Sequence, residues 1–235
     1  MPYKESTGNM YPWVDGMHTH LGGECGHGCI YCYVNSRRWG RPKRYIGEIR
    51  LIDKELEVDY GSGKTIFIEH MNDMFADRVP SKFIDQILEH CNKYPDNTYV
   101  FQSKNPARAL EFVDKFPEKI MFGTTIETNR ENIIRKVSKA PPPNARFTGI
   151  YALKHLKNLK TTRIFVTLEP IMDFDLEIMT SWLKCLKPDF VNIGADSQGH
   201  KLQEPSWSKV EKLIKNIQNA NIEIREKSNL ERLKR

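Results

Sequence analysis

The stretch "TIFIEHMNDMFADRVPSKFIDQILEHCNKYPDNTYVFQS", residues 65–103, decides the fold class. Apolar, β-branched runs of strand length open it at 65–70 and close it at 98–103. Between them, the apolar residues of 81–94 recur at intervals of three and four, as one face of an amphipathic helix requires. Strand, helix and strand over this length predict a right-handed βαβ unit with parallel strands.

The same alternation continues to the end of the chain. We expect further strands at 120–127, 163–170, 190–196 and 222–227, and helices at 107–116, 130–140 with a continuation at 150–158, 176–187 and 207–220. A complete eightfold barrel takes about 250 residues, and some 60 residues precede the regular units here. The sequence therefore predicts one domain over 1–235, with an N-terminal segment at 1–64 and β/α units over 65–235. Its predicted fold is α/β, a partial (open) parallel β/α barrel of six or seven strands.

Polar residues follow the expected strands. They are His70–Asp73, Gln102–Lys104, Thr125–Glu127, Glu169, Asp196–Ser197 and Glu226–Lys227. Parallel α/β sheets bind their ligands at the carboxyl ends of the strands, which lie together on one rim. We therefore expect the functional site on that rim.

The bulk composition excludes some classes and leaves others open. The chain of 235 residues is 39% apolar, carries a net charge of +6 and has five cysteines, an odd number that argues against a disulfide framework. Neither a signal-peptide pattern nor an apolar run of about 18 residues is present. We expect a cytoplasmic protein without a membrane partner. The charge permits a nucleic-acid partner without favouring one.

Three of the five cysteines lie within the stretch "GGECGHGCIYCYV", residues 22–34, whereas Cys91 and Cys185 are isolated. A structural zinc site would need a fourth ligand, to be recruited from the histidines at 18, 20 and 27. An iron-sulfur cluster would leave one iron for another ligand. The surrounding glycines suit a loop that wraps a metal closely.

The spacing of Cys25, Cys29 and Cys32, with Tyr31 before the last, resembles the signature of the radical S-adenosylmethionine (SAM) enzymes. In that superfamily the three cysteines hold a 4Fe-4S cluster, and the amino and carboxylate groups of SAM chelate the open iron. The resemblance implies a partial six-stranded barrel and chemistry through a 5′-deoxyadenosyl radical. It also implies an electron donor such as flavodoxin or ferredoxin.

A closer resemblance covers most of the chain. The phrases "NDMF", "FQSKNPARALEF", "TTIETNR", "LEPIMDFD" and "NIGADS" resemble a small phage-associated radical SAM family, formerly of unknown function. Within that family the sequence is similar to enzymes that cleave the 7-deazaguanine base queuine. The implied reaction is a lyase step of queuosine salvage, which releases the cyclopentenediol and regenerates the aminomethyl-7-deazaguanine precursor.

The resemblance implies roles for Tyr31, Met71 and Asn72 around the cofactor, and positions on the rim suggest roles for Ser103, Lys104 and Glu127. Tyr31 would contact the adenine of SAM. The family's usual Gly-Gly-Glu-Pro is replaced by "EHMNDMF" at 69–75, so the SAM amino group would be bound by the backbone around Met71 and Asn72. A hydroxyl and a cation, from Ser103 and Lys104, suit the SAM carboxylate. The two oxygens of Glu127 suit the ribose hydroxyls.

Substrate recognition calls for a carboxylate, because a 7-deazaguanine base presents two adjacent N–H donors. Glu169 and Asp196 are the two candidates. Further polar contacts to the cyclopentenediol are expected from Ser197, His20, Lys227 and Asn229. The sequence does not identify a group that protonates the leaving amine.

Several alternatives stay open. The basic run "RRWGRPKR" at 37–44 suits a phosphate backbone, which would make the chain a radical SAM enzyme acting on tRNA or DNA. "DGMHTHL" at 15–21 contains the His-x-His pair of barrel metallohydrolases, whose further ligands come from later strand ends; those ends carry Glu169 and Asp196 here rather than histidines. A zinc-stabilised nucleic-acid binder and a non-catalytic iron-sulfur scaffold are the non-enzyme alternatives. "GSGKT" at 61–65 is read as a turn, because Val58 stands where a phosphate loop has its first glycine.

Overall fold

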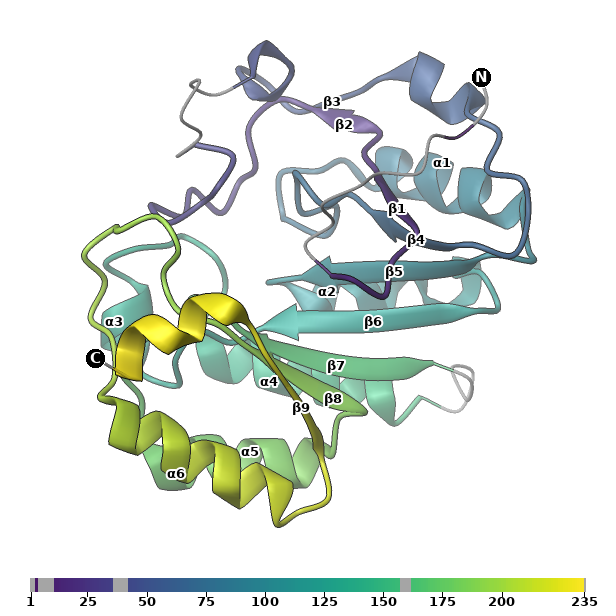
Figure 1. Cartoon of the computed structure of the whole chain (residues 1–235). Coiled ribbons are helices and arrows are strands. Elements are labelled where there is room, and N and C mark those ends of the chain that lie inside the picture. The colour runs from purple at the N-terminus through teal and green to yellow at the C-terminus, as the bar shows by residue number, and fades with distance from the viewer. Residues whose placement is uncertain (1–2, 4–10, 36–41, 157–161, 235) are drawn as a thin grey trace.

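The computed structural model describes residue 3 and residues 11–35, 42–156 and 162–234 (Figure 1). A seven-stranded, all-parallel sheet in the order β1-β4-β5-β6-β7-β8-β9 forms its centre. The strands are β1 (Gly16–His18), β4 (Thr65–Ile68), β5 (Thr98–Ser103), β6 (Ile120–Thr125), β7 (Arg163–Leu168), β8 (Phe190–Ile193) and β9 (Glu223–Glu226). Seven strands in chain order confirm the predicted open parallel barrel. Strand β1, which pairs with β4, was not among the strands expected from the sequence.

Helices cover the outer face of this sheet (Figure 1). They are α1 (Ser81–Asn92), α2 (Pro106–Ala109), α3 (Glu131–Ile134), α4 (Pro143–Lys154), α5 (Leu176–Leu186) and α6 (Trp207–Gln218). The helix expected at 107–116 is a single α-turn that continues as the 3-10 helix η3 (Leu110–Lys115). Of the helix expected at 130–140, only the short helix α3 is present. Helix α4 begins inside the proline run, because proline fits the first turn of a helix.

The segment between β1 and β4 carries short elements. A two-stranded antiparallel sheet joins β2 (Leu21–Gly22) to β3 (Arg50–Leu51), and the 3-10 helices η1 (Lys43–Tyr45) and η2 (Asp53–Glu57) flank β3. A last 3-10 helix, η5 (Ser228–Lys234), follows β9. The cysteine loop therefore leaves the small sheet and lies beside the large one, as Figure 1 shows.

Alternation along each strand separates two apolar clusters. Outward residues such as Ile66, Phe101 and Phe122 pack with the helices in the main core. A second cluster lies on the inner face of the sheet. It consists of Tyr11, Val14, Phe67, Val100, Met121, Phe165 and Phe190, with Trp13 and Met17 packed against it. Burial on both faces explains the near-continuous apolar runs of the strands.

A glycine in β6 makes room inside the barrel. A Cβ atom at Gly123 would lie 2.2 Å from the ring of Phe165, which stacks on Phe190 with its centroid 5.0 Å away. Only a residue without a side chain allows this packing.

Among the described residues, no helix is both long and apolar enough to cross a membrane.

Candidate active site

A cavity of about 570 Å³ lies between the cysteine loop and the carboxyl ends of the strands. Its size falls in the usual range for ligand pockets. Predicted site residues that line it are Cys25, Cys29, Tyr31, Cys32, Met71, Asn72, Ser103, Lys104, Glu169, Asp196, Ser197 and Lys227. The structure therefore brings twelve of the fifteen predicted residues to one space. The other three, Glu127, His20 and Asn229, lie behind its wall.

The three thiols of the loop form one edge of the cavity. Cys29 is buried, with its Sγ 3.0 Å from Ser138 Oγ and 3.4 Å from Lys104 Nζ. Burial raises the pKa of the Cys25 thiol to about 12. Cys91 is buried in the main core and Cys185 is exposed on α5, so the triplet has no fourth cysteine. Three neighbouring thiols on a cavity suit a bound metal or cluster.

A buried carboxylate that the sequence analysis did not single out fastens the loop to the sheet. Asp73 accepts hydrogen bonds from His27 Nε2 at 2.7 Å and from the backbone N–H of Lys104 at 2.7 Å. Burial alone would raise the pKa of Asp73, but His27 and the N–H donors outweigh it and lower that pKa. Asp73 thus links the cysteine loop to the segment after β5.

A second buried network lies under the loop. Lys104 Nζ is 2.7 Å from Glu127 Oε1 and donates to Tyr31 Oη at 3.0 Å. Glu127 also accepts from Tyr31 and from Arg146 Nη1, the latter at 2.5 Å. Burial tends to raise the pKa of Glu127, but Arg146 and Lys104 lower it to about 2. The sequence analysis missed Arg146, because nothing local marks a buried arginine in a helix.

These contacts bear on the role predicted for Glu127. Its side chain is 0% exposed, does not line the cavity and has both oxygens engaged. In this arrangement the carboxylate is turned toward Tyr31, Lys104 and Arg146 rather than into the cavity, so the structure gives no support to a contact with the ribose. The reason is the arginine on α4, which draws the carboxylate behind the wall. Glu127 instead holds Tyr31 and Lys104 beside Cys29.

The segment after β4 contributes two unusual residues. Asn72 is 8% exposed, and neither of its amide atoms has a hydrogen-bond partner among the described residues. A buried polar group without a partner is costly, so this amide on the cavity wall suits a polar ligand. Met71 lies beside it and accepts from Tyr33 Oη at 3.2 Å.

Glu69 is a further residue that sequence reasoning missed. Its backbone has a left-handed φ of 59°, rare for a glutamate, and its side chain lines the cavity at 2% exposure. Burial raises the pKa of its carboxyl to about 7. Strained backbone and a perturbed pKa in a cavity are typical of functional residues.

Glu169 and Asp196, the two carboxylates predicted to bind a 7-deazaguanine base, have different hydrogen-bond partners. Glu169 forms an ion pair with Lys227 at 2.6 Å and accepts from Asn229 Nδ2 at 3.0 Å. Asp196 instead binds its own loop: its oxygens accept from the N–H groups of Gln198 at 3.0 Å and His200 at 2.5 Å. Asn229 therefore positions Glu169 from behind the wall.

His20 does not reach the cavity, contrary to the substrate contact predicted for it. Its side chain is 0% exposed and lies 2.8 Å from Glu69 Oε1, between β1 and α1. The metallohydrolase alternative also loses its ligand set, because Glu169 and Asp196 line the cavity whereas His18 and His20 do not.

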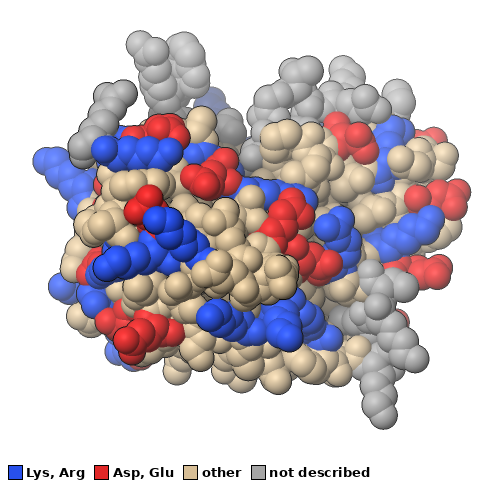
Figure 2. Space-filling model, turned by 60° about the horizontal axis from the view of Figure 1, so that its bottom comes forward, with Lys and Arg blue, Asp and Glu red and all other residues tan. Residues whose placement is uncertain are grey.

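The basic run at 37–44 lies partly outside the described residues, which begin again at 42. Of its described basic residues, Lys43 is exposed, and Arg44 forms an ion pair with Glu55 at 2.8 Å. On the face shown in Figure 2, basic and acidic groups lie side by side. The mixture of charges on that face does not by itself mark a nucleic-acid surface.

A polar floor closes the cavity toward the barrel interior. Tyr11 Oη donates to Gln102 Oε1 at 2.7 Å and lies 3.0 Å from Thr167 Oγ1, and Gln102 Nε2 donates to Thr125 Oγ1 at 2.9 Å.

Residues 13–227 match the family described as Protein of unknown function (DUF5131). The chain belongs to this family. No curated protein matches the chain.

Solved structures share the fold of this DUF5131 chain. A mutant of spore photoproduct lyase gives a TM-score of 0.64 at 11% identity, over 96% of this chain and 79% of that one. Another, with bound AdoMet and dinucleoside spore photoproduct, gives 0.55 at 12% identity, over 87% and 61%. Streptococcus suis SuiB bound to S-adenosylmethionine gives 0.56 at 11% identity, over 92% and 51%. The DUF5131 chain spans less than two thirds of the latter two proteins. At these identities the similarity shows the fold.

Proposed function

We propose that this protein is a radical SAM lyase that cleaves queuine to its aminomethyl-7-deazaguanine precursor. The observation that carries the proposal is the meeting of a three-thiol loop with polar strand ends on one cavity. Two of the proteins that share its fold were solved with SAM bound, which supports the cofactor. The residues present fit both groups: three thiols leave one iron site open, and the buried Asn72 amide lacks a partner among the described residues.

Cys25, Cys29 and Cys32 would hold the 4Fe-4S cluster, and SAM would lie along Asn72 and Lys104. When bound, the reduced cluster and SAM supply a 5′-deoxyadenosyl radical that abstracts a substrate hydrogen. The ammonium of Lys104, beside Cys29 and fixed by Glu127, carries the charge that attracts the SAM carboxylate. Tyr31 presents an aromatic ring to the same space. An electron donor such as flavodoxin or ferredoxin would reduce the cluster.

Glu169 is the better candidate for reading the base. Its carboxylate lines the cavity, and Lys227 and Asn229 hold it in place. Both oxygens of Asp196 accept hydrogen bonds from backbone N–H groups of its own loop, so this carboxylate stabilises the loop that lines the cavity. An acid that meets paired N–H donors rejects a base lacking them, because the carboxylate would be left buried and unpaired.

Glu69 is the candidate proton donor for the leaving amine. It is the cavity-lining carboxyl whose pKa burial raises to about 7, so both of its protonation states are populated at neutral pH. A pKa near the working pH suits general acid catalysis. Nothing in the sequence alone pointed to this residue.

Anaerobic reconstitution tests the enzyme class. We expect about four irons per chain and 5′-deoxyadenosine after reductant and SAM are added. The scaffold alternative gives iron without 5′-deoxyadenosine. Zinc on the cysteines in place of iron and sulfide would indicate the zinc-stabilised binder.

Product analysis then tests the substrate. The reduced enzyme is incubated with free queuine, its nucleoside and queuosine-containing tRNA, and aminomethyl-7-deazaguanine is measured by mass spectrometry. We expect product from the free base, and loss of product in Glu169→Gln at unchanged iron content. Product from the tRNA alone would refute the free-base lyase and favour an enzyme acting on nucleic acid.

A further inference from the structure

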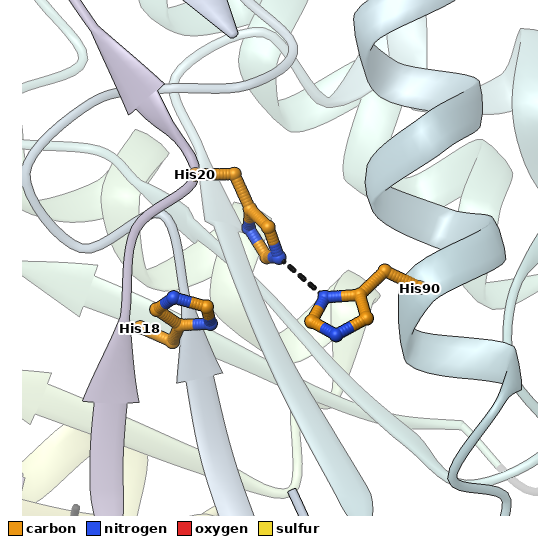
Figure 3. Close-up of side chains that lie close together, drawn as sticks. All are labelled: His18, His20 and His90. Atoms are coloured by element: carbon orange, nitrogen blue, oxygen red, sulfur yellow. Dashed lines mark hydrogen bonds between the residues drawn. The ribbon is translucent and has the colours of Figure 1, made fainter. Parts of the chain in front are cut away.

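Three histidines from two elements converge between β1 and α1, outside the cavity. His18 ends β1, His20 follows in the turn to β2, and His90 lies on α1 (Figure 3). One ring nitrogen of each lies within 4.8 Å of the other two. Exposed fractions of 8%, 0% and 1% show that water does not reach them freely.

The outer nitrogen of each ring faces an oxygen acceptor. His90 Nε2 donates to the carbonyl of Val58 at 2.8 Å. His18 Nε2 faces Glu55 Oε2 at 3.0 Å, and His20 Nδ1 faces Glu69 Oε1 at 2.8 Å. Because a neutral imidazole has one N–H, a hydrogen on the outer nitrogen leaves a lone pair on the inner one.

Those inner lone pairs face each other. His20 Nε2 and His90 Nδ1 are 2.8 Å apart, as the dashed line in Figure 3 shows. Tyr60 Oη is 2.5 Å from His18 Nδ1 and 3.1 Å from His20 Nε2, and its single hydrogen can serve only one of them. When Glu69 is ionised, these three converging acceptors share one hydrogen, and a bound cation would satisfy all of them.

We propose that His18, His20 and His90 bind one Zn²⁺ ion. Zinc prefers four ligands at about 2.0–2.1 Å from imidazole nitrogen, so neighbouring ligand atoms stand about 3.4 Å apart. Side-chain shifts of roughly 1 Å bring the three nitrogens to that spacing, with Tyr60 Oη at the fourth position.

The surroundings match those of a structural zinc site. Metal-bound histidines usually donate their other N–H to a carboxylate or a backbone carbonyl, and the outer nitrogen of each of the three rings faces such an acceptor here. Glu55 and the ionised form of Glu69 would balance the charge of the ion. Burial leaves no open coordination position toward the cavity, which distinguishes the site from a hydrolytic centre.

Such an ion would fasten the base of the cysteine loop to α1. His20 stands two residues before Gly22, where the cysteine-containing stretch begins, and its Nδ1–H orients Glu69 on the cavity wall. Because metal binding would be coupled to folding, removing the ion should loosen this connection.

The test uses the full chain with Cys25, Cys29 and Cys32 all changed to Ser, so that neither cluster nor zinc can occupy the loop. After incubation with ZnSO₄ and gel filtration, we expect about one zinc per chain by mass spectrometry of metals. His90→Gln in this background should lose it. His155→Gln, an exposed histidine on the C-terminal end of α4, is the matched control and should keep it.

Cobalt gives a second readout that does not need the His90 variant to fold. Co²⁺ in place of zinc should show the visible bands of a tetrahedral nitrogen and oxygen site, without the sulfur-to-metal band that a cysteine ligand would produce. A folded triple-Ser protein that retains less than a tenth of an equivalent of zinc would overturn the proposal. A sulfur-to-metal band would overturn it as well.

Discussion

The buried ion pair between Arg146 and Glu127 gives the sharpest prediction. Both side chains are 0% exposed, and Arg146 Nη1 lies 2.5 Å from Glu127 Oε2. Arg146 also donates to the carbonyls of Thr125 at 3.0 Å and Pro141 at 2.6 Å. Arg146→Met fills a similar volume without charge, so it removes these bonds and leaves Glu127 with fewer partners.

Breaking a buried pair by removing one partner costs about 3–5 kcal/mol. The lower end applies here, because Lys104 and Tyr31 still bond to Glu127. We expect a loss of about 3 kcal/mol in the free energy of unfolding, or about 6–12 °C in Tm for a chain of this size. Urea titration followed by circular dichroism measures it under reducing conditions.

Two further variants isolate the cause. Arg135→Met removes an exposed pair with Glu131 on α3 and should cost less than about 0.5 kcal/mol. The double variant Glu127→Gln with Arg146→Met leaves no unpaired buried carboxylate, although the partly exposed Lys104 loses its ion pair, so it should recover part of the loss. A loss below 1 kcal/mol in Arg146→Met, or a double variant worse than the sum of the single ones, would refute the reasoning.

The same pair predicts a pH dependence. Arg146 and Lys104 outweigh the effect of burial and lower the pKa of Glu127 from 4.5 to about 2 in the folded state. A depressed folded pKa stabilises the fold above the unfolded pKa, and this contribution is lost as pH falls from about 4.5 to about 2. In Arg146→Met the stability should fall less steeply over that window. An unchanged slope would contradict the assignment.

Three further outcomes are expected. Cys29→Ala should abolish iron binding and 5′-deoxyadenosine formation, whereas Cys185→Ala, on the exposed face of α5, should change neither, as iron analysis and chromatography would show. Lys104→Met should weaken SAM binding by about tenfold or more in calorimetric titrations, since a charge-assisted hydrogen bond contributes about 1.5–3 kcal/mol; equal affinity would refute its contact with the SAM carboxylate. Gly123→Ala should destabilise the fold by about 1–3 kcal/mol in urea titrations, because its Cβ would lie 2.2 Å from the Phe165 ring.

The sequence by itself determined the fold class and the place of the site. Runs such as 98–103 and 163–168 are apolar throughout because both faces of the sheet are covered, and their polar ends mark one rim. The cysteine spacing is local, so it could be read without any tertiary information. For the same reason Lys104 and Glu169, each beside a strand end, could be expected on the rim, and both line the cavity.

Only the tertiary structure decided the partners of each side chain. Glu127 was expected in the cavity, but Arg146, distant in sequence and on another element, holds it behind the wall. His20 was expected to meet substrate, but His90 on α1 lies on its other side. Periodicity reports which face of an element is buried. It does not report which buried groups from different elements meet, because that depends on how helices pack across the sheet.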